Sequence, residues 1–139
     1  MKKSISFLVL FVLVVAGVFA QNAALRNGMY QAVGSSDEIG VVPDHTWNYQ
    51  TNLGQQMNGY YLLASYVGRA SLTSPNCWYR ATGPVVGNTI RTNVCSVNWD
   101  LAYQIGAGDI EIGEFNIWTI INFETFEANG VRFHWVRTN

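Results

Sequence analysis

The acidic residues between positions 109 and 114 come closest to a metal-binding pattern. Asp109, Glu111 and Glu114 could offer the hard oxygen ligands that Ca²⁺ prefers. In an extended strand Asp109 and Glu111 would share one face, and Glu114 would lie on the other unless Gly113 forms a bulge. The segment does not match an EF-hand loop. We therefore interpret these carboxylates as a solvated strand face and expect neither a metal nor another cofactor.

The other reactive side chains form no recognisable catalytic motif. His45 and His134 are the only histidines, and the HExxH signature of a catalytic zinc site is absent. No Gly-x-Ser-x-Gly motif is present, and Gly106-Ala107-Gly108 lacks the lysine and following helix of a phosphate-binding loop. Carboxylate pairs for glycosidase chemistry could be drawn, as in any acid-bearing β protein, from Asp100, Asp109, Glu111, Glu114, Glu124 and Glu127. We therefore expect a protein that is not an enzyme.

The two cysteines, Cys77 and Cys95, predict a disulfide. An exported chain enters an oxidising compartment, where such a pair usually forms a bridge. The midpoint between the two cysteines falls within residues 83–88, which contain glycine, proline and asparagine. If this stretch is the tip of a hairpin, the cysteines face each other, and the bridge would stabilise the fold by roughly 3 kcal/mol. A reactive or metal-binding thiol pair is disfavoured because the CxxC spacing is absent.

Aromatic residues are the most informative side chains for binding. The five tryptophans fall in different expected strands: Trp47, Trp78, Trp99, Trp118 and Trp135. Ordinary core packing accounts for such residues, because a domain of this size buries most of its large side chains. The functional alternatives are an aromatic-lined cavity for a small apolar ligand and a stacking platform for a sugar.

The first twenty residues read as a signal peptide. Lys2 and Lys3 precede an apolar run from Ile5 to Phe19, and Ala20 ends a small-residue pattern typical of a cleavage site. The run of about 15 residues is shorter than the roughly 20 needed to cross a bilayer. We therefore expect cleavage after Ala20, a secreted or periplasmic location, and no stable membrane span afterwards.

The mature part, residues 21–139, is expected to form a single β domain. It carries six arginines against nine acidic residues, because both lysines lie in the signal peptide. The domain has no basic tract, so nucleic acid is not expected as a partner. Its low charge and high aromatic content are typical of a chain that buries a core.

Strands must position these side chains. The end of the chain predicts two long strands, Ile110–Phe126 and Val131–Arg137, joined by a turn at Asn129-Gly130, a pair that favours positive φ angles. The second strand of the cysteine hairpin can continue through Asn98–Ile105. Other expected strands are Gly28–Val33, Thr46–Thr51, Gly59–Val67, Cys77–Thr82 and Thr89–Val97. The pattern predicts an all-β, antiparallel meander of about eight strands in a closed or nearly closed barrel, with a β-sandwich as the alternative.

Three features resemble the lipocalin-type (calycin) barrel family: Gly28-Met29-Tyr30, the β meander, and Arg137 in the last strand. That family has Gly-x-Trp at the start of its first strand and a late basic residue that packs over the tryptophan. Here Tyr30 stands in place of the tryptophan. The resemblance implies a barrel whose interior can hold a small hydrophobic ligand.

These observations favour an exported, non-enzymatic binding protein that holds a small apolar molecule. The alternative is a structural or protein-interaction module of the cell envelope or the secreted fraction. A ligand binder requires an enclosed apolar cavity, whereas an interaction module requires a filled core and an exposed apolar patch.

Overall fold

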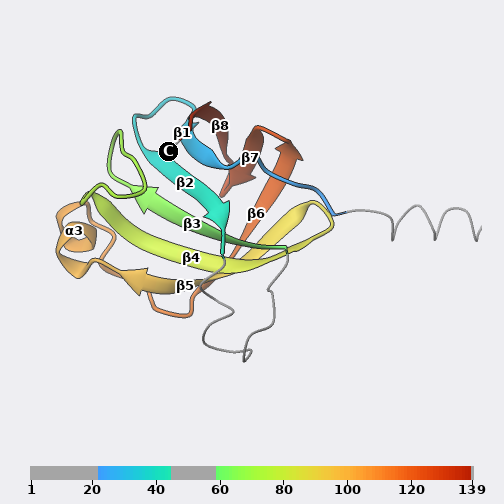
Figure 1. Cartoon of the computed structure of the whole chain (residues 1–139). Helices are drawn as coiled ribbons and strands as arrows, with labels where there is room; N and C mark the ends of the chain where they lie inside the picture. The colour runs from blue at the N-terminus through green and yellow to red at the C-terminus, as the bar shows by residue number, and fades with distance from the viewer. Residues whose placement is uncertain (1–21, 45–58, 139) are drawn as a thin grey trace, which may run out of the picture.

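The computed structural model describes residues 22–44 and 59–138, which form a closed antiparallel barrel (Figure 1). Each strand pairs with the next one along the chain, and β1 pairs with β8 to close the barrel. The strands are β1 (Gly28–Ala32), β2 (Glu38–Pro43), β3 (Tyr60–Tyr66), β4 (Cys77–Val86), β5 (Thr89–Val97), β6 (Phe115–Asn122), β7 (Thr125–Ala128) and β8 (Val131–Arg137). The expected all-β meander is confirmed, and the sandwich alternative is wrong.

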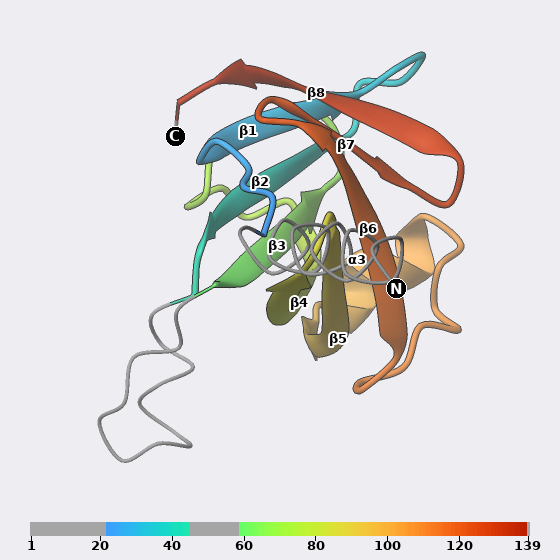
Figure 2. The same ribbon diagram turned by 90° about the vertical axis from the view of Figure 1, so that its right-hand side faces the viewer.

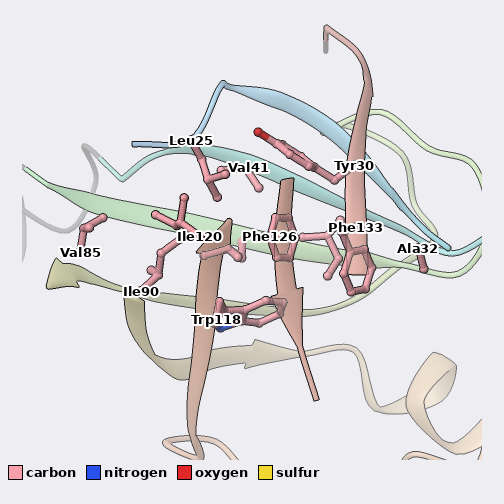
Figure 3. Packing of buried hydrophobic residues seen from close by; sticks show 12 residues of the cluster. Leu25, Tyr30, Ala32, Val41, Val85, Ile90, Trp118, Ile120, Phe126 and Phe133 are labelled. Carbon is pink, nitrogen blue, oxygen red and sulfur yellow. The ribbon is translucent and has the colours of Figure 1, made fainter. Parts of the chain in front are cut away.

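Period-2 alternation directs one set of side chains from each strand into the barrel. Phe126 lies at the centre of this interior, surrounded by Tyr30, Trp118 and Phe133 (Figure 3). Its ring centroid is 5.0 Å from that of Tyr30, 5.7 Å from that of Trp118, and 5.0 Å from that of Phe133, with which it stacks. A packed aromatic cluster therefore fills the middle of the barrel.

The segment before β1 closes one end of the barrel. The backbone N–H of Ala23 donates to Gly87, and that of Arg26 donates to Phe123, so the segment is tied to two of the turns at this end. Leu25 is buried in the core between these bonds, and its backbone exchanges hydrogen bonds with the Tyr61 hydroxyl. This end is therefore covered by the chain itself.

The opposite end carries the connections β1–β2, β3–β4, β5–β6 and β7–β8. The β5–β6 connection contains a short helix, α3 (Trp99–Gln104), which lies at the far side of the barrel from the N-terminal segment (Figure 1). The strand expected over Asn98–Ile105 is therefore wrong. Asn98 caps the helix, because its side chain accepts a hydrogen bond from the Leu101 N–H, and Asp100 lies in the first turn.

The final hairpin is shorter than the sequence predicts. Residues 110–114 precede β6, and a turn at Phe123 and Glu124 divides the remaining stretch into β6 and β7. The Asn122 side chain accepts a hydrogen bond from the Glu124 N–H, which stabilises this turn. The turn at Asn129-Gly130 is confirmed, with φ angles of 52° and 78° at these two residues.

The predicted disulfide between Cys77 and Cys95 is wrong, because both cysteines are free. The hairpin of β4 and β5 exists, but it turns at Gly87 and Asn88, and its register pairs Val86 with Thr89. The centre of the hairpin therefore lies later in the chain than the midpoint between the two cysteines. Cys95 consequently lies beside a bulge opposite Arg80 and Ala81, whereas Cys77 lies before the first paired residue of the hairpin, Tyr79.

The β3–β4 loop folds over the outer surface of β1, β2 and β3. Leu72 from this loop packs beside a second buried cluster that includes Met29, Tyr66 and Cys77. The Glu38 carboxylate accepts hydrogen bonds from the Ala70 N–H and from the Arg137 guanidinium, which also donates to the Ala70 carbonyl. This clasp fixes the loop to the start of β2, where Glu38 lies, and to the end of β8, where Arg137 lies.

Some sequence expectations lie outside the described residues: the signal peptide, the strand Thr46–Thr51, His45 and Trp47. Within the described ranges, no helix is long and apolar enough to cross a membrane.

Candidate ligand cavity

A partly enclosed cavity of about 190 Å³ lies inside the barrel at the end opposite the N-terminal segment. Its walls come from β2, β4, β6, β7, β8 and the β7–β8 turn. The lining residues are Ile39, Tyr79, Asn116, Ile117, Trp118, Ala128, Asn129, Val131 and Phe133. The lining is mainly apolar and aromatic with a few polar groups, which is the usual composition of a small-molecule site.

The aromatic floor of the cavity is held in place by the core beneath it. Trp118 is 2% exposed, and its indole N–H donates to the Thr92 hydroxyl at 2.7 Å. Phe133 stacks on Phe126 with an angle of 7° between the ring planes. Because the single donor of Trp118 is already paired, this residue offers an apolar ring surface to the cavity.

Two asparagine carboxamides supply polar groups to the lining. Asn116 lies on β6, and Asn129 lies in the β7–β8 turn. Neither side chain has a hydrogen-bond partner among the described residues. They are therefore available to a ligand or to water.

Tyr79 adds a hydroxyl group along one wall, and Ser65 is its cross-strand neighbour. Ile39 pairs with Ser65 across β2 and β3, and Ser65 pairs with Tyr79 across β3 and β4, so all three share the inner face of the sheet. Burial raises the pKa of the Tyr79 phenol and outweighs a hydrogen bond with the Ser65 side chain, which lowers it. The nearby Glu114 carboxylate acts in the same direction as burial. Tyr79 is therefore a neutral hydroxyl near neutral pH.

A wider groove of about 430 Å³ runs outside the barrel along β4 and β5. Trp78, Arg80, Ser96 and Asn98 are among its lining residues. This groove is shallower and more polar than the barrel cavity, so it suits an apolar ligand less well.

The acidic residues singled out from the sequence do not form a cation site. Asp109, Glu111 and Glu114 are described in the connection before β6 and not on a strand, and the acidic residues at 111 and 114 are exposed. Among the described residues, no group of three His, Cys, Asp or Glu side chains could hold a metal ion. These carboxylates therefore lie on an exposed loop and not on the solvated strand face that the sequence predicts.

His134 lies on the outer face of β8. Its ring nitrogen Nδ1 is 3.2 Å from the Thr125 hydroxyl on β7, a cross-strand contact. Asp100 lies in α3, while Glu124 and Glu127 form surface ion pairs with Arg26 and Arg132. None of these side chains belongs to the lining of the barrel cavity.

The late arginine has a different role from the one that the family resemblance implies. Arg137 binds Glu38 on the outer surface of the barrel and does not lie over the aromatic ring of β1. Arg26 instead lies over the Trp135 ring, with 3.5 Å between the guanidinium carbon and the ring centroid. Trp135 also packs close to Gly28, where φ is 145° and a Cβ would clash with the indole ring. The cation of this contact, Arg26, thus comes from the segment before β1, and the tryptophan, Trp135, comes from β8.

The outer face of β6 is unusually apolar for an exposed surface. β6 crosses the front of the barrel in Figure 2, with β7 as one neighbour and β5 as the other. Along it, Phe115, Ile117 and Ile121 are exposed, and Phe123 in the following turn is exposed as well. This β6 stripe is the exposed apolar patch that an interaction module requires.

We expect the two free thiols to differ in reactivity. Cys95 is exposed and Cys77 is buried, although burial raises the pKa of both thiols. In the folded protein a thiol reagent such as DTNB should modify Cys95 quickly and Cys77 slowly, because access limits the second reaction. Denaturation should release two equivalents in all. Two thiols that react at equal rates, or none under denaturing conditions, would contradict the structure.

Comparison with known proteins gives no significant match, either to a protein-family model, to a curated protein or to a solved structure.

Proposed function

We propose that this protein is an exported, lipocalin-like binding protein that holds a small apolar molecule at the open end of its barrel. Export rests on the signal-peptide pattern of residues 1–20, and it implies a secreted or periplasmic location. The closed meander of eight strands supports the lipocalin-like assignment. A fold hosts many functions, so the binding proposal rests on the cavity itself.

The cavity of about 190 Å³ is the observation that carries the proposal. One end of the barrel is covered by the segment before β1, so a ligand would enter from the opposite end. There Trp118 and Phe133 form an apolar floor and Tyr79 forms a side wall. Transfer of an apolar molecule from water to such a surface is favourable by roughly 25 cal/mol per Å² buried.

Toluene is a suitable first probe because it is apolar, uncharged and small. We expect its addition to raise the melting temperature of the wild-type protein. At a toluene concentration tenfold above the Kd, the stabilisation should be about 1.4 kcal/mol, since only the folded state has the cavity. Differential scanning calorimetry over a series of toluene concentrations measures this effect.

A cavity-filling variant locates the binding. Ala128 lines the cavity, so Ala128→Leu should occupy part of its volume and abolish the toluene-dependent shift. Ala24→Leu is the matched control, because Ala24 is exposed in the N-terminal segment and outside the cavity. Equal shifts in wild type and Ala128→Leu would place the binding elsewhere and refute the proposal.

The β6 stripe favours a second candidate, an interaction module of the cell envelope or secreted fraction. Phe115, Ile117 and Ile121 present apolar surface to solvent, and the middle of the barrel is packed. Replacement of Ile121 by Ser should weaken association with a protein partner and leave toluene binding unchanged, because Ile121 does not line the cavity. Pull-down from host extract with both forms distinguishes the two candidates.

A further inference from the structure

The outer groove of about 430 Å³ is lined by residues of the β3–β4 loop, β4, β5 and the start of α3. Ser74 and Pro75 come from the loop, β4 contributes its first four residues, and Asn98 caps the helix. The loop and α3 lie at the same end of the barrel (Figure 1). Pockets for drug-sized ligands begin at about 300 Å³, so this groove has room for a ring compound.

Arg80 gives the outer groove a positive charge. It is half-buried, and it is the only charged residue among the described residues that line the groove. Its guanidinium lies beside the Tyr66 hydroxyl. Arg26, Arg132 and Arg137 each pair with a glutamate, whereas no described carboxylate forms an ion pair with Arg80. An anionic ligand group would therefore compensate a charge that burial has partly removed from water.

The ionisable groups around Arg80 are neutral near neutral pH. Burial raises the pKa of the Tyr66 phenol and the pKa of the Cys77 and Cys95 thiols, and the positive charge of Arg80 acts on all three groups. Their neutral forms supply no counter-charge to the guanidinium. The Asp44 carboxylate acts on Cys95, but Asp44 does not line the groove. The groove itself is therefore cationic.

Carboxylates near the groove restrict the kind of anion that it suits. Glu114 acts on Tyr79, which lines the groove. Asp100 lies two residues after Asn98, and neither of these acidic residues lines the groove. Their repulsion is roughly twice as large for a dianion such as phosphate as for a carboxylate. A guanidinium can also donate two parallel hydrogen bonds to a carboxylate. The groove therefore favours a ligand with a single carboxylate.

The remaining lining residues suit a sugar ring. Trp78 is half-buried, and its indole offers flat apolar surface on which the C–H face of a sugar can pack. Ser96 adds a hydroxyl group to the lining. The Asn98 Oδ1 accepts a hydrogen bond from the Leu101 N–H, so its NH₂ group remains a donor for a ligand hydroxyl. This composition matches the stacking platform for a sugar that the tryptophans suggest.

We propose that the outer groove binds a sugar ring that carries one carboxylate, a uronate, as a second site of this protein. The carboxylate pairs with the Arg80 guanidinium, the ring packs on Trp78, and the sugar hydroxyls reach Ser96 and Asn98. The site is separate from the barrel cavity, so this inference does not depend on the proposed function.

Glucuronate, glucose and acetate test the inference. Glucuronate combines a carboxylate with a sugar ring, and each of the other two has only one of these features. We expect glucuronate to bind wild type about tenfold more tightly than glucose, in line with hydrogen bonds to a charged group, and about fivefold more tightly than acetate. NMR titrations of the full mature chain give the three Kd values. The indole N–H signal of Trp78 should shift with both sugars.

The variant Arg80→Gln removes the charge and keeps a long polar side chain. It should weaken glucuronate binding about tenfold and leave glucose binding unchanged, because only the carboxylate depends on the cation. Arg91→Gln is the matched control, since Arg91 is exposed on β5 and outside the groove, and it should change neither Kd. The comparison of the three probes on wild type remains decisive if Arg80→Gln does not fold.

The outcomes concern the outer groove alone. Equal Kd values for glucuronate and glucose, or a Trp78 indole signal that does not move at saturation, overturn the inference. Acetate that binds as tightly as glucuronate overturns the assignment to a sugar, and so does unchanged glucuronate affinity in a folded Arg80→Gln variant. Toluene should bind this variant and wild type equally, because Arg80 does not line the barrel cavity. Failure of the inference therefore leaves the proposed function standing.

Discussion

Replacement of Phe126 by Ala is expected to lower the free energy of unfolding by about 3–5 kcal/mol, the usual cost of deleting a buried phenylalanine ring. Phe126 is 0% exposed and contacts Tyr30, Trp118 and Phe133, which come from three other strands (Figure 3). Loss of its ring leaves a cavity that these large neighbours cannot fill by small shifts. Urea unfolding followed by tryptophan fluorescence measures the change.

Phe115→Ala is the matched control for this prediction. Phe115 is 55% exposed on β6, so the same truncation there should change the unfolding free energy by about 0.5 kcal/mol or less. A similar loss in both variants would contradict the arrangement in which Phe126 is central and Phe115 lies on the surface.

Replacement of Arg137 by Met should lower the free energy of unfolding by about 2–4 kcal/mol at neutral pH. Glu38 is 3% exposed, and removal of its cation leaves a buried carboxylate without charge compensation. Loss of one partner from a fully buried pair costs about 3–5 kcal/mol, and the expected cost is smaller here because the Arg137 side chain is 26% exposed. The β3–β4 loop would also lose the contact between Arg137 and the Ala70 carbonyl.

The pH dependence of this variant gives a second readout. In the wild type, burial raises the pKa of Glu38, but hydrogen bonds from Arg137 and Ala70 outweigh it, and the net pKa is lowered. The resulting stabilisation is present above the unfolded pKa of about 4.3 and is lost as the pH falls through the folded value. Without Arg137 the pKa should rise, so the deficit of the variant should shrink as the pH falls towards about 4.

Arg132→Met is the matched control for the arginine experiment. Arg132 pairs with Glu127 at 3.1 Å, but both side chains are more than a third exposed. Its loss should therefore change the unfolding free energy by less than about 1 kcal/mol. Equal costs for the two arginine variants, or a deficit of Arg137→Met that grows in acid, would contradict a buried clasp.

Local patterns in the sequence predict the meander well. Asn129-Gly130 indicates a two-residue turn, because both residues tolerate positive φ, and the structure shows these angles. The apolar run Gly59–Val67 is a strand, as its tyrosines and flanking glycines indicate. The short helix α3 was not predicted, although the capping residue Asn98 and the acidic Asp100 give the local signal.

The disulfide prediction failed because the midpoint of two cysteines does not determine the register of a hairpin. Gly87 has a φ of 63° and lies in the turn, so the position of this turn sets which residues face each other. The bulge next to Arg80 shifts the register again near Cys95. A shift of the register by one residue moves each side chain to the other face of the sheet. A turn placed one or two residues away from its expected position is therefore enough to prevent two cysteines from facing each other.

The candidate cavity could not be located from the sequence. Its walls combine Ile39, Tyr79, Trp118 and Phe133, which come from four strands and become neighbours only when the barrel closes. Trp118 was among the aromatic residues considered for a ligand site, but nothing in the sequence separates it from the other tryptophans.

The location of a bound apolar molecule tests the central claim most directly. Nuclear Overhauser effects between toluene protons and assigned aromatic protons of the mature protein measure this location. Binding in the barrel predicts contacts with Trp118 and Phe133, and none with Phe123 on the outer surface. Contacts confined to Phe115, Ile121 and Phe123, which do not line the cavity, or no contacts at saturating toluene, would contradict the proposal that this barrel is a small-molecule binding protein.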